Sequence, residues 1–252
     1  MNRLWVLAGV SLLVLTMSGG LLRAGGTEAA TVESASEVLQ ALCALPVKGI
    51  PPALMQDAQG VAIIPNVLKA GFVVGGRFGR GVVLVRKADG GWGNPLFITL
   101  VGGGIGWQLG VQSTDVVLVF KTQRSLDRFL KGKGKLTLGA DVAVAAGPLG
   151  RQAEAATDAQ LKAEIFSYSR SRGLFAGLSL EGAAILSDWG ADEAYYHVRG
   201  GRPADIMVGK GLAIPAGAEQ LKGQLTRLST PSVPPAMPVP MPPPPLPPLP
   251  PR

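Results

Sequence analysis

The spacing of apolar residues predicts helices at both ends of the folded part of this chain. Residues 34–45 place apolar side chains at helical spacing, and Ser34 and Glu37 occupy the positions of an N-terminal capping box. A second, short helix is expected over residues 51–60, because two prolines favour its start and a glycine its end. Residues 217–228 repeat leucine on one helical face and predict a C-terminal helix.

The pattern between these helices is that of β-strands. Short β-rich runs bounded by turn residues are found at 61–64, 81–87, 95–101 and 115–121, and further strands are expected at 141–146, 163–170 and 178–186. Asp89-Gly90-Gly91 predicts a hairpin turn, and Ser125 is expected to cap a helix over 125–132. Many of the 35 glycines fall inside strand patterns, which indicates bulges and close backbone approach. We therefore expect an α+β fold with a glycine-rich antiparallel β-sheet or partial barrel packed by several helices.

The N-terminus has the composition of a signal peptide. Residues 1–26 combine a basic start, an apolar stretch and small residues in the order typical of a secretory signal, with cleavage after Gly20 or Gly26. The apolar stretch is shorter than the roughly 20 residues of a membrane span. We therefore expect an exported protein that is periplasmic, envelope-associated or secreted.

The C-terminus is dominated by proline. Residues 231–252 are expected to form a disordered, solvated tail of polyproline II character, because proline lacks a backbone N–H and cannot join a core. A protein partner for this tail is one expectation, and a spacer role is the other. The predicted organisation is a folded domain at 31–200, a C-terminal helix and linker at 201–230, and the tail.

Positive charge gathers in one segment of a chain whose formal net charge is +7. Residues 121–135 contain a single acid, Asp127, and six basic residues: Lys121, Arg124, Arg128, Lys131, Lys133 and Lys135. Such a segment attracts anionic lipid head groups by about 1 kcal/mol per basic residue near the surface. An ordinary solvated helix face is the alternative. Nucleic-acid binding is not expected, because the segment has neither interleaved aromatic residues nor a recognised module.

Two arginines interrupt an otherwise apolar, glycine-containing run at residues 168–182. Arg170 and Arg172 share one strand face because they are two residues apart. A charge in such a run is costly unless it is paired or reaches water. Either these arginines bind lipid phosphate beside an apolar floor from Tyr168 and Phe175, or they stabilise the sheet.

In the second reading, one of the two arginines pairs with Glu164 or Glu181. The sequence alone leaves both readings open.

Catalytic and metal-binding motifs are weak. Ser179 lies in a near match to a nucleophile elbow, but Glu181 stands where the second glycine is required, and His197 is the only histidine. One histidine and one cysteine cannot form the usual metal clusters. We expect no enzymatic activity, no metal and no cofactor; a serine hydrolase built on Ser179 is the least favoured alternative.

Residues 35–198 resemble the SYLF domain, also called the Ysc84 or DUF500 family. The resemblance is carried by "KGIPPALMQDAQGVAIIPNV", "GNPLFITLVGGGIGWQLGVQSTDVVLVF", "SYSRSRGLFAGLSLEG" and "DEAYY". The chain departs from the family pattern at Gln59, Gly104 and His197, where lysine, serine and glycine are usual. The resemblance implies a non-enzymatic lipid-binding module, with an α/β unit similar to the BON domain.

The expected signal peptide places this chain with the bacterial members of the family, for which anionic phospholipid or a membrane surface is the implied partner. The candidate lipid-binding residues are Arg170, Arg172, Tyr168, Phe175, Arg128, Lys131, Lys133 and Lys135. An envelope scaffolding protein that acts through its proline-rich tail is the alternative.

Overall fold

The computed structural model describes residues 24–45, 49–131, 134–148, 162–172, 180 and 182–230, with the backbone alone at 24–25, 71–74, 104–111 and 171–172. The predicted proline-rich tail, most of the predicted signal peptide, and the candidate residues Lys133 and Phe175 lie outside the described residues.

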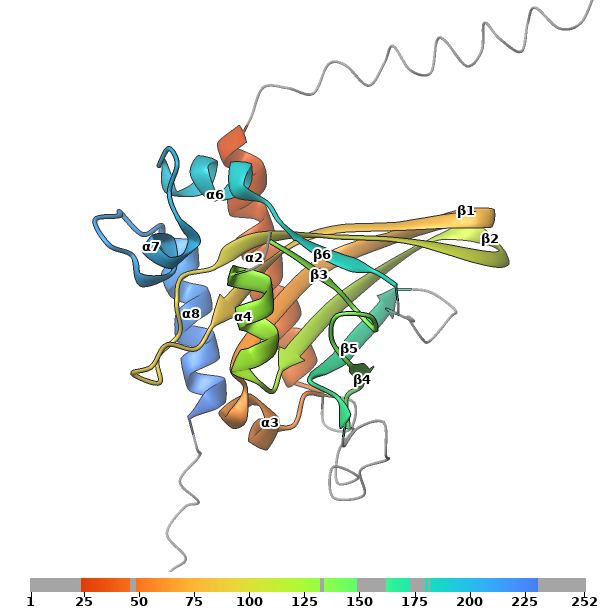
Figure 1. Ribbon diagram of the computed structural model, residues 1–252, viewed down its shortest axis with the longest axis horizontal. Helices are drawn as coiled ribbons and strands as arrows, with labels where there is room; N and C mark the ends of the chain where they lie inside the picture. The colour runs from red at the N-terminus through yellow and green to blue at the C-terminus, as the bar shows by residue number, and fades with distance from the viewer. Residues whose placement is uncertain are drawn as a thin grey trace, which may run out of the picture.

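One six-stranded sheet forms the centre of the described structure (Figure 1). Its strands are β1 (Gly60–Val85), β2 (Leu96–Phe120), β3 (Lys135–Thr137), β4 (Val144–Ala146), β5 (Ile165–Arg172) and β6 (Ala184–Ser187). The long strands β1 and β2 pair antiparallel from Gly60–Phe120 to Val83–Leu96. Strands β5 and β6 pair with opposite ends of β2, and β4 and β3 extend them outward. The sheet is a curled, open half-barrel.

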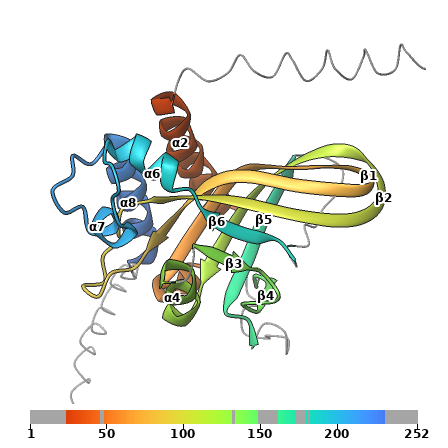
Figure 2. The ribbon, with the colours of Figure 1, turned by 45° about the horizontal axis from the view of Figure 1, so that its top comes forward.

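The β1–β2 ribbon bends back on itself, so the two halves of β1 stack (Figure 2). A Cβ atom at Gly79 would lie 2.8 Å from the Val67 side chain, and one at Gly81 would meet the Ile63 carbonyl oxygen. At the base, the Arg86 amide donates a hydrogen bond of 2.8 Å to the carbonyl of Gln59. Glycine is required where the two halves touch, because any side chain would separate them.

Helices cover the sheet on two sides. They are α2 (Ala24–Cys43), α3 (Pro52–Asp57), α4 (Gln123–Lys131), α6 (Trp189–Tyr196), α7 (Pro203–Val208) and α8 (Ala216–Ser229). Helix α2 lies against one side of β1 and also contacts α6 and α8, whereas α4 lies on the other side (Figures 1 and 2). Leu39 of α2, Leu221 of α8 and Leu126 of α4 are fully buried in the core. None of the helices in the described part of the chain has the length and apolar character that crossing a bilayer requires.

The structure confirms the predicted α+β class and the hairpin turn at 89–91. Gly90 has a φ of 83°, and the Lys87 amide donates to the carbonyl of Gly91. The predicted runs 61–64 and 81–87 are instead parts of one strand, β1, and the runs 95–101 and 115–121 are parts of β2. The glycine-rich segments between them are held in the strand conformation by pairing with each other.

Two helix starts differ from the sequence prediction. Helix α2 begins at Ala24 rather than at residue 34, because residues 27–33 also favour helix, so Ser34 lies in the helix interior. Helix α4 begins at Gln123, and Ser125 lies in its first turn, where its hydroxyl donates to the Thr122 carbonyl at 2.9 Å.

Candidate functional site

Arg170 is bound by a buried carboxylate. Its Nη2 and Nε donate to Oδ2 of Asp115 at 2.9 and 3.3 Å, and the Asp115 side chain is only 1% exposed. The other carboxylate oxygen of Asp115 accepts the backbone N–H of Asn66 at 3.1 Å. Asn66 has a φ of 49° and lies in the bulge where the β1–β2 register shifts. The guanidinium therefore stabilises the carboxylate that holds this bulge.

The partner of Arg170 differs from the two that the sequence suggested. Glu164 instead lies 3.6 Å from Nη1 of Arg128, and it accepts a hydrogen bond from the Thr122 hydroxyl. Glu181 lies outside the described residues. Asp115 was missed because it is 55 residues from Arg170 and becomes its neighbour only through the β2–β5 register. The one feature of the sequence that could have pointed to Asp115 is its place as a single acid after the uncharged residues 95–114.

Tyr168 is buried rather than displayed on a surface. Its ring fills the space that a Cβ at Gly147 would need, and its hydroxyl donates to the Pro148 carbonyl at 3.1 Å. Burial raises the pKa of this phenol. Arg172 is the last residue of β5 and stands opposite Ser113 of β2; only its backbone is described. Lipid binding by the 168–175 group stays a prediction.

Helix α4 presents a basic face. Its apolar side is fixed in the core by Leu126 and Phe129. We call the following side chains the basic face of α4, with β3 included: Arg124, Arg128, Lys131 and Lys135. Lys131 is 77% exposed and bonds Asp127 one turn earlier at 2.8 Å, which lowers the pKa of that carboxyl. Arg128 is held more firmly, because it also donates to the carbonyl of Asp141.

The β1–β2 ribbon has a strongly asymmetric charge pattern. Residues 58–88 contain basic residues but no acid, and residues 95–114 contain no charged residue at all. On β1, Leu68 and Phe78 are 48% and 50% exposed. They line a hollow of about 280 Å³ whose other walls come from α2 and the bulge; its lining residues are Ala30, Thr31, Ser34, Pro65, Asn66, Leu68, Phe78, Gly79 and Arg80. We call this space the ribbon hollow.

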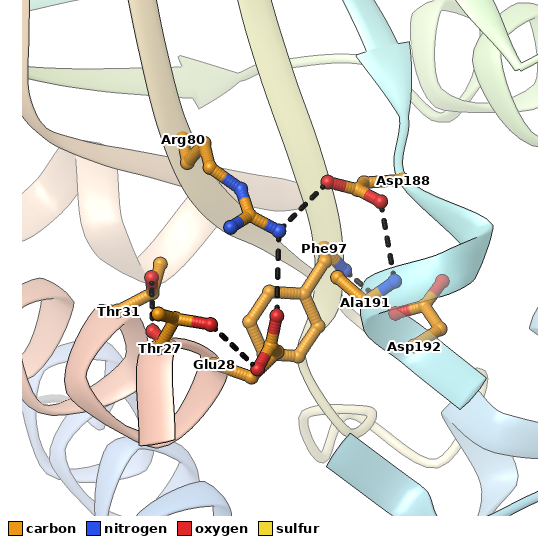
Figure 3. A network of polar contacts seen from close by, with 8 residues as sticks. All are labelled: Thr27, Glu28, Thr31, Arg80, Phe97, Asp188, Ala191 and Asp192. Atoms are coloured by element: carbon orange, nitrogen blue, oxygen red, sulfur yellow. Dashed lines mark hydrogen bonds and ion pairs between the residues drawn. The ribbon is translucent and has the colours of Figure 1, made fainter. Parts of the chain in front are cut away.

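A polar network fixes one wall of the ribbon hollow (Figure 3). Nη2 of Arg80 on β1 lies 3.4 Å from Glu28 of α2 and 3.1 Å from Asp188, which caps α6. Next to it, Asp192 accepts the backbone N–H of Phe97 at 2.7 Å, and burial raises the pKa of this carboxyl to about 7. The network joins α2, β1, β2 and α6 at one end of the bent ribbon. We call this end, at residues 64–68 and 78–80 of β1, the root of the ribbon.

A second hollow of about 310 Å³ lies between the C-terminal ends of α2 and α8. Its lining residues are Gln40, Cys43, Ala44, Gln224, Arg227 and Leu228. Burial raises the pKa of the Cys43 thiol to about 11, which keeps it protonated near neutral pH. Cys43 is therefore a packing residue rather than a nucleophile.

The described residues form no metal-binding cluster. Within them, no cluster of three or more histidine, cysteine or acidic side chains could hold a metal ion. His197 is exposed and ends α6 with a φ of 53°, and Ser179 lies outside the described residues. The geometry around His197 is that of a left-handed helix cap.

Comparison with known proteins decides the family. A protein-family model described as "Las17-binding protein actin regulator" matches residues 101–228, about half of the chain. The chain belongs to the Ysc84 family. The Ysc84 match begins inside β2 and runs through α8, so it includes the basic face of α4 and the Asp115–Arg170 pair.

Other Ysc84 proteins from yeast and mammals are similar to this chain. LAS seventeen-binding protein 3 of Saccharomyces cerevisiae is 46% identical over 149 residues, which is 58% of this chain and 32% of that protein. SH3 domain-containing YSC84-like protein 1 of Bos taurus is 42% identical over 176 residues, 70% of this chain and 50% of that protein. The chain therefore spans about a third to a half of the length of these relatives. No solved structure matches it.

Proposed function

We propose that this protein is exported and binds anionic phospholipid at a membrane surface without transforming it. The observation that supports this function best is the basic face of α4. Leu126 and Phe129 anchor the helix in the core, so its cations are held outward on a rigid support. All four, Arg124, Arg128, Lys131 and Lys135, are exposed, and Arg128 is also tied to the carbonyl of Asp141. At about 1 kcal/mol for each basic residue near an anionic surface, this face contributes a useful part of the binding free energy.

Vesicle sedimentation tests this function. The measured quantity is the ratio of affinities for vesicles of phosphatidylserine with phosphatidylcholine and for vesicles of phosphatidylcholine alone. All variants contain residues 1–26, so the contribution of that apolar segment to vesicle binding is the same in every variant and does not affect the comparison between them. We expect the wild-type protein to prefer the anionic vesicles and to lose this preference as salt rises.

The decisive variant is Arg124→Gln/Lys131→Gln/Lys135→Gln, for which we expect the preference to fall about ten- to a hundredfold. The matched control removes three exposed basic residues near α7: Arg199→Gln/Arg202→Gln/Lys210→Gln. Each set contains one ion pair with an aspartate, Lys131–Asp127 in the first and Arg202–Asp205 in the second. Equal losses in the two variants, or a wild-type protein indifferent to anionic lipid, contradict the proposal.

A protein partner is the second candidate function. It is favoured by the names of relatives, which include a LAS seventeen-binding protein and SH3 domain-containing proteins. In this chain the proline-rich residues 231–252 are the segment suited to such a partner. Deletion of 231–252 separates the two functions, because a lipid-binding protein keeps its vesicle affinity and a tail-dependent scaffold loses its partner.

Catalysis by Ser179 is the least supported alternative. It predicts covalent labelling of the protein by a fluorophosphonate probe and loss of labelling in Ser179→Ala. We expect no labelling.

A further inference from the structure

We propose that the bent end of the β1–β2 ribbon, with Leu68 and Phe78 at its root, inserts into the boundary between head groups and acyl chains of an anionic bilayer. This inference relies on the proposed function for the class of ligand. It assigns the contact to a different part of the molecule from the basic face of α4.

Leu68 and Phe78 differ from the large apolar side chains near them on β1 that the structure describes. Ile63, Ile64 and Val67 are at most 1% exposed, whereas Leu68 and Phe78 leave about half of their surface in water. Both line the ribbon hollow. Two large apolar side chains that share a hollow on a projecting element form a surface that gains from leaving water.

The ribbon extends beyond the strands that flank it (Figures 1 and 2). At the bend, the β1 and β2 backbones pair with each other at Gly71–Gly110, Val73–Gly106 and Val74–Ile105. No described strand other than β1 and β2 pairs with these positions, so their outer backbone groups need water. Unsatisfied backbone groups are not tolerated deep in hydrocarbon. The ribbon is therefore suited to the hydrated interface of a bilayer and not to crossing it.

The sequence of the bend fits the same environment. Its apolar residues are Phe72, Val73, Val74, Ile105, Trp107, Leu109 and Val111. Aromatic and aliphatic residues of this kind are favoured at the membrane interface. The backbone register pairs Val73, Val74, Ile105 and Val111 across the ribbon.

The charge pattern of the ribbon favours an anionic bilayer as the surface into which it inserts. Lys69 is exposed next to Leu68 on β1. No acid lies between residues 58 and 88 or between 95 and 114, so the bent part of the ribbon carries no acid that anionic head groups would repel. Long basic side chains at the root of an apolar element reach toward head groups while their neighbours go deeper. A protein groove would not require this absence of acids along β1 and along residues 95–114.

The root of the ribbon is held in place before any membrane is met. Gly79 stacks on Ile64 and Val67, and Arg80 is bound by Glu28 and Asp188. Insertion by a preformed element avoids the entropic cost of ordering a loop.

A site-specific fluorophore gives the direct test. In a Cys43→Ser background, an environment-sensitive dye is attached to Phe78→Cys, with Val208→Cys as the matched control. Val208 is on α7 and is 65% exposed, so both labels begin in water. Vesicles of phosphatidylserine and phosphatidylcholine are prepared with and without bromine on the acyl chains. We expect the dye at position 78 to brighten and to be quenched by bromine, and the dye at 208 to do neither. A dye at 78 that behaves like the dye at 208 overturns the inference.

Sedimentation of two double variants gives an independent measure. Leu68→Ser/Phe78→Ser is expected to bind the anionic vesicles about ten- to a hundredfold more weakly than wild type. Leu45→Ser/Val208→Ser removes two exposed apolar side chains elsewhere and is expected to bind like wild type. Equal affinities of the two variants overturn the inference. If the first variant fails to fold, as judged by circular dichroism, the fluorophore experiment decides alone.

The outcomes separate this inference from the proposed function. If wild type prefers anionic vesicles and the α4 variant loses that preference, but the dye at 78 stays in water, insertion by the ribbon is wrong and the function stands. If wild type binds no vesicles, both are wrong.

Discussion

Asp115 of β2 and Arg170 of β5 stand directly opposite each other in the sheet, and two guanidinium nitrogens of Arg170 bond one oxygen of the Asp115 carboxylate. The second oxygen of that carboxylate holds the amide of Asn66 in the β1 bulge. Three strands are thus joined through one buried side chain. The arginine in the "SYSRSRG" segment has a structural partner, whichever ligand the protein binds.

Replacement of Arg170 is expected to destabilise the fold. Arg170→Gln removes the ion pair between Arg170 and the buried Asp115 carboxylate, at a cost of about 2 kcal/mol, which is below the usual value for a buried pair because Arg170 is partly exposed. Urea unfolding measures the change. Arg202→Gln removes an exposed arginine that pairs with Asp205, and it is expected to cost less than about 1 kcal/mol. Equal stabilities of the two variants contradict the structural role of Arg170.

The two halves of β1 lie so close together that adding a single methyl group at Gly81 is expected to destabilise the fold. In Gly81→Ala the new Cβ meets the Ile63 carbonyl oxygen and lies 2.8 Å from the Cα of Ile64, so backbone must move. We expect a loss of about 1–3 kcal/mol in the free energy of unfolding, the range for overpacked sites.

Gly103→Ala is the matched control, because a Cβ there meets nothing within 4 Å. It is expected to leave stability unchanged or slightly higher. Thermal and urea unfolding of both variants provide the measurement, and a neutral Gly81→Ala would show that the two halves of β1 do not stack.

Because of Asp192, we expect the protein to become less stable to unfolding as the pH rises from mildly acidic to neutral. Its pKa is about 7 in the folded protein, raised by burial, and near 4 in an unfolded chain. Between these values the folded state holds the proton that the unfolded state has lost. The free energy of unfolding therefore decreases as pH rises from about 4 to about 7, at up to about 1.4 kcal/mol per pH unit.

The contribution of Asp192 is isolated by Asp192→Asn. The amide oxygen can still accept the Phe97 N–H but does not titrate, so the decrease between pH 5 and pH 8 is expected to shrink. Asp205→Asn, on an exposed carboxylate, should keep the wild-type pH dependence. An unchanged slope in Asp192→Asn would assign the pH dependence to other groups.

Cys43 is expected to react slowly with thiol reagents. A pKa of about 11, well above the ordinary value for a thiol, lowers the thiolate fraction at pH 8 about a hundredfold. The reaction rate with a disulfide reagent in the native state, compared with the rate in guanidinium chloride, measures this protection. Similar rates in both conditions would mean that the hollow between α2 and α8 does not shield the thiol.

The elements of this fold could be predicted from the sequence better than their connections. The apolar runs 61–64 and 115–121 have a clear strand pattern, and the hairpin turn at 89–91 has the residues that such a turn requires. Glycine has a low strand propensity, so the segments that join these runs into β1 and β2 could not be recognised. Their strand conformation comes from cross-strand pairing, which a local pattern does not contain.

The candidate site shows the same limit. The basic residues of α4 follow from composition and helical spacing, and the structure exposes Arg124, Arg128, Lys131 and Lys135. The burial of Tyr168 and the exposure of Phe78 depend on which sheet face is covered, and that is decided by elements far away in the chain. The ion pair of Arg170 depends on the β2–β5 register for the same reason.

Because β1 and β2 bend together, the ribbon can become longer without any change in how the rest of the half-barrel packs. Residues added opposite each other near Val73 and Gly106 would move the turning point outward and leave Gly79, Gly81 and their contacts where they are. The reach of this element is thus free to change during evolution while the half-barrel behind it stays the same.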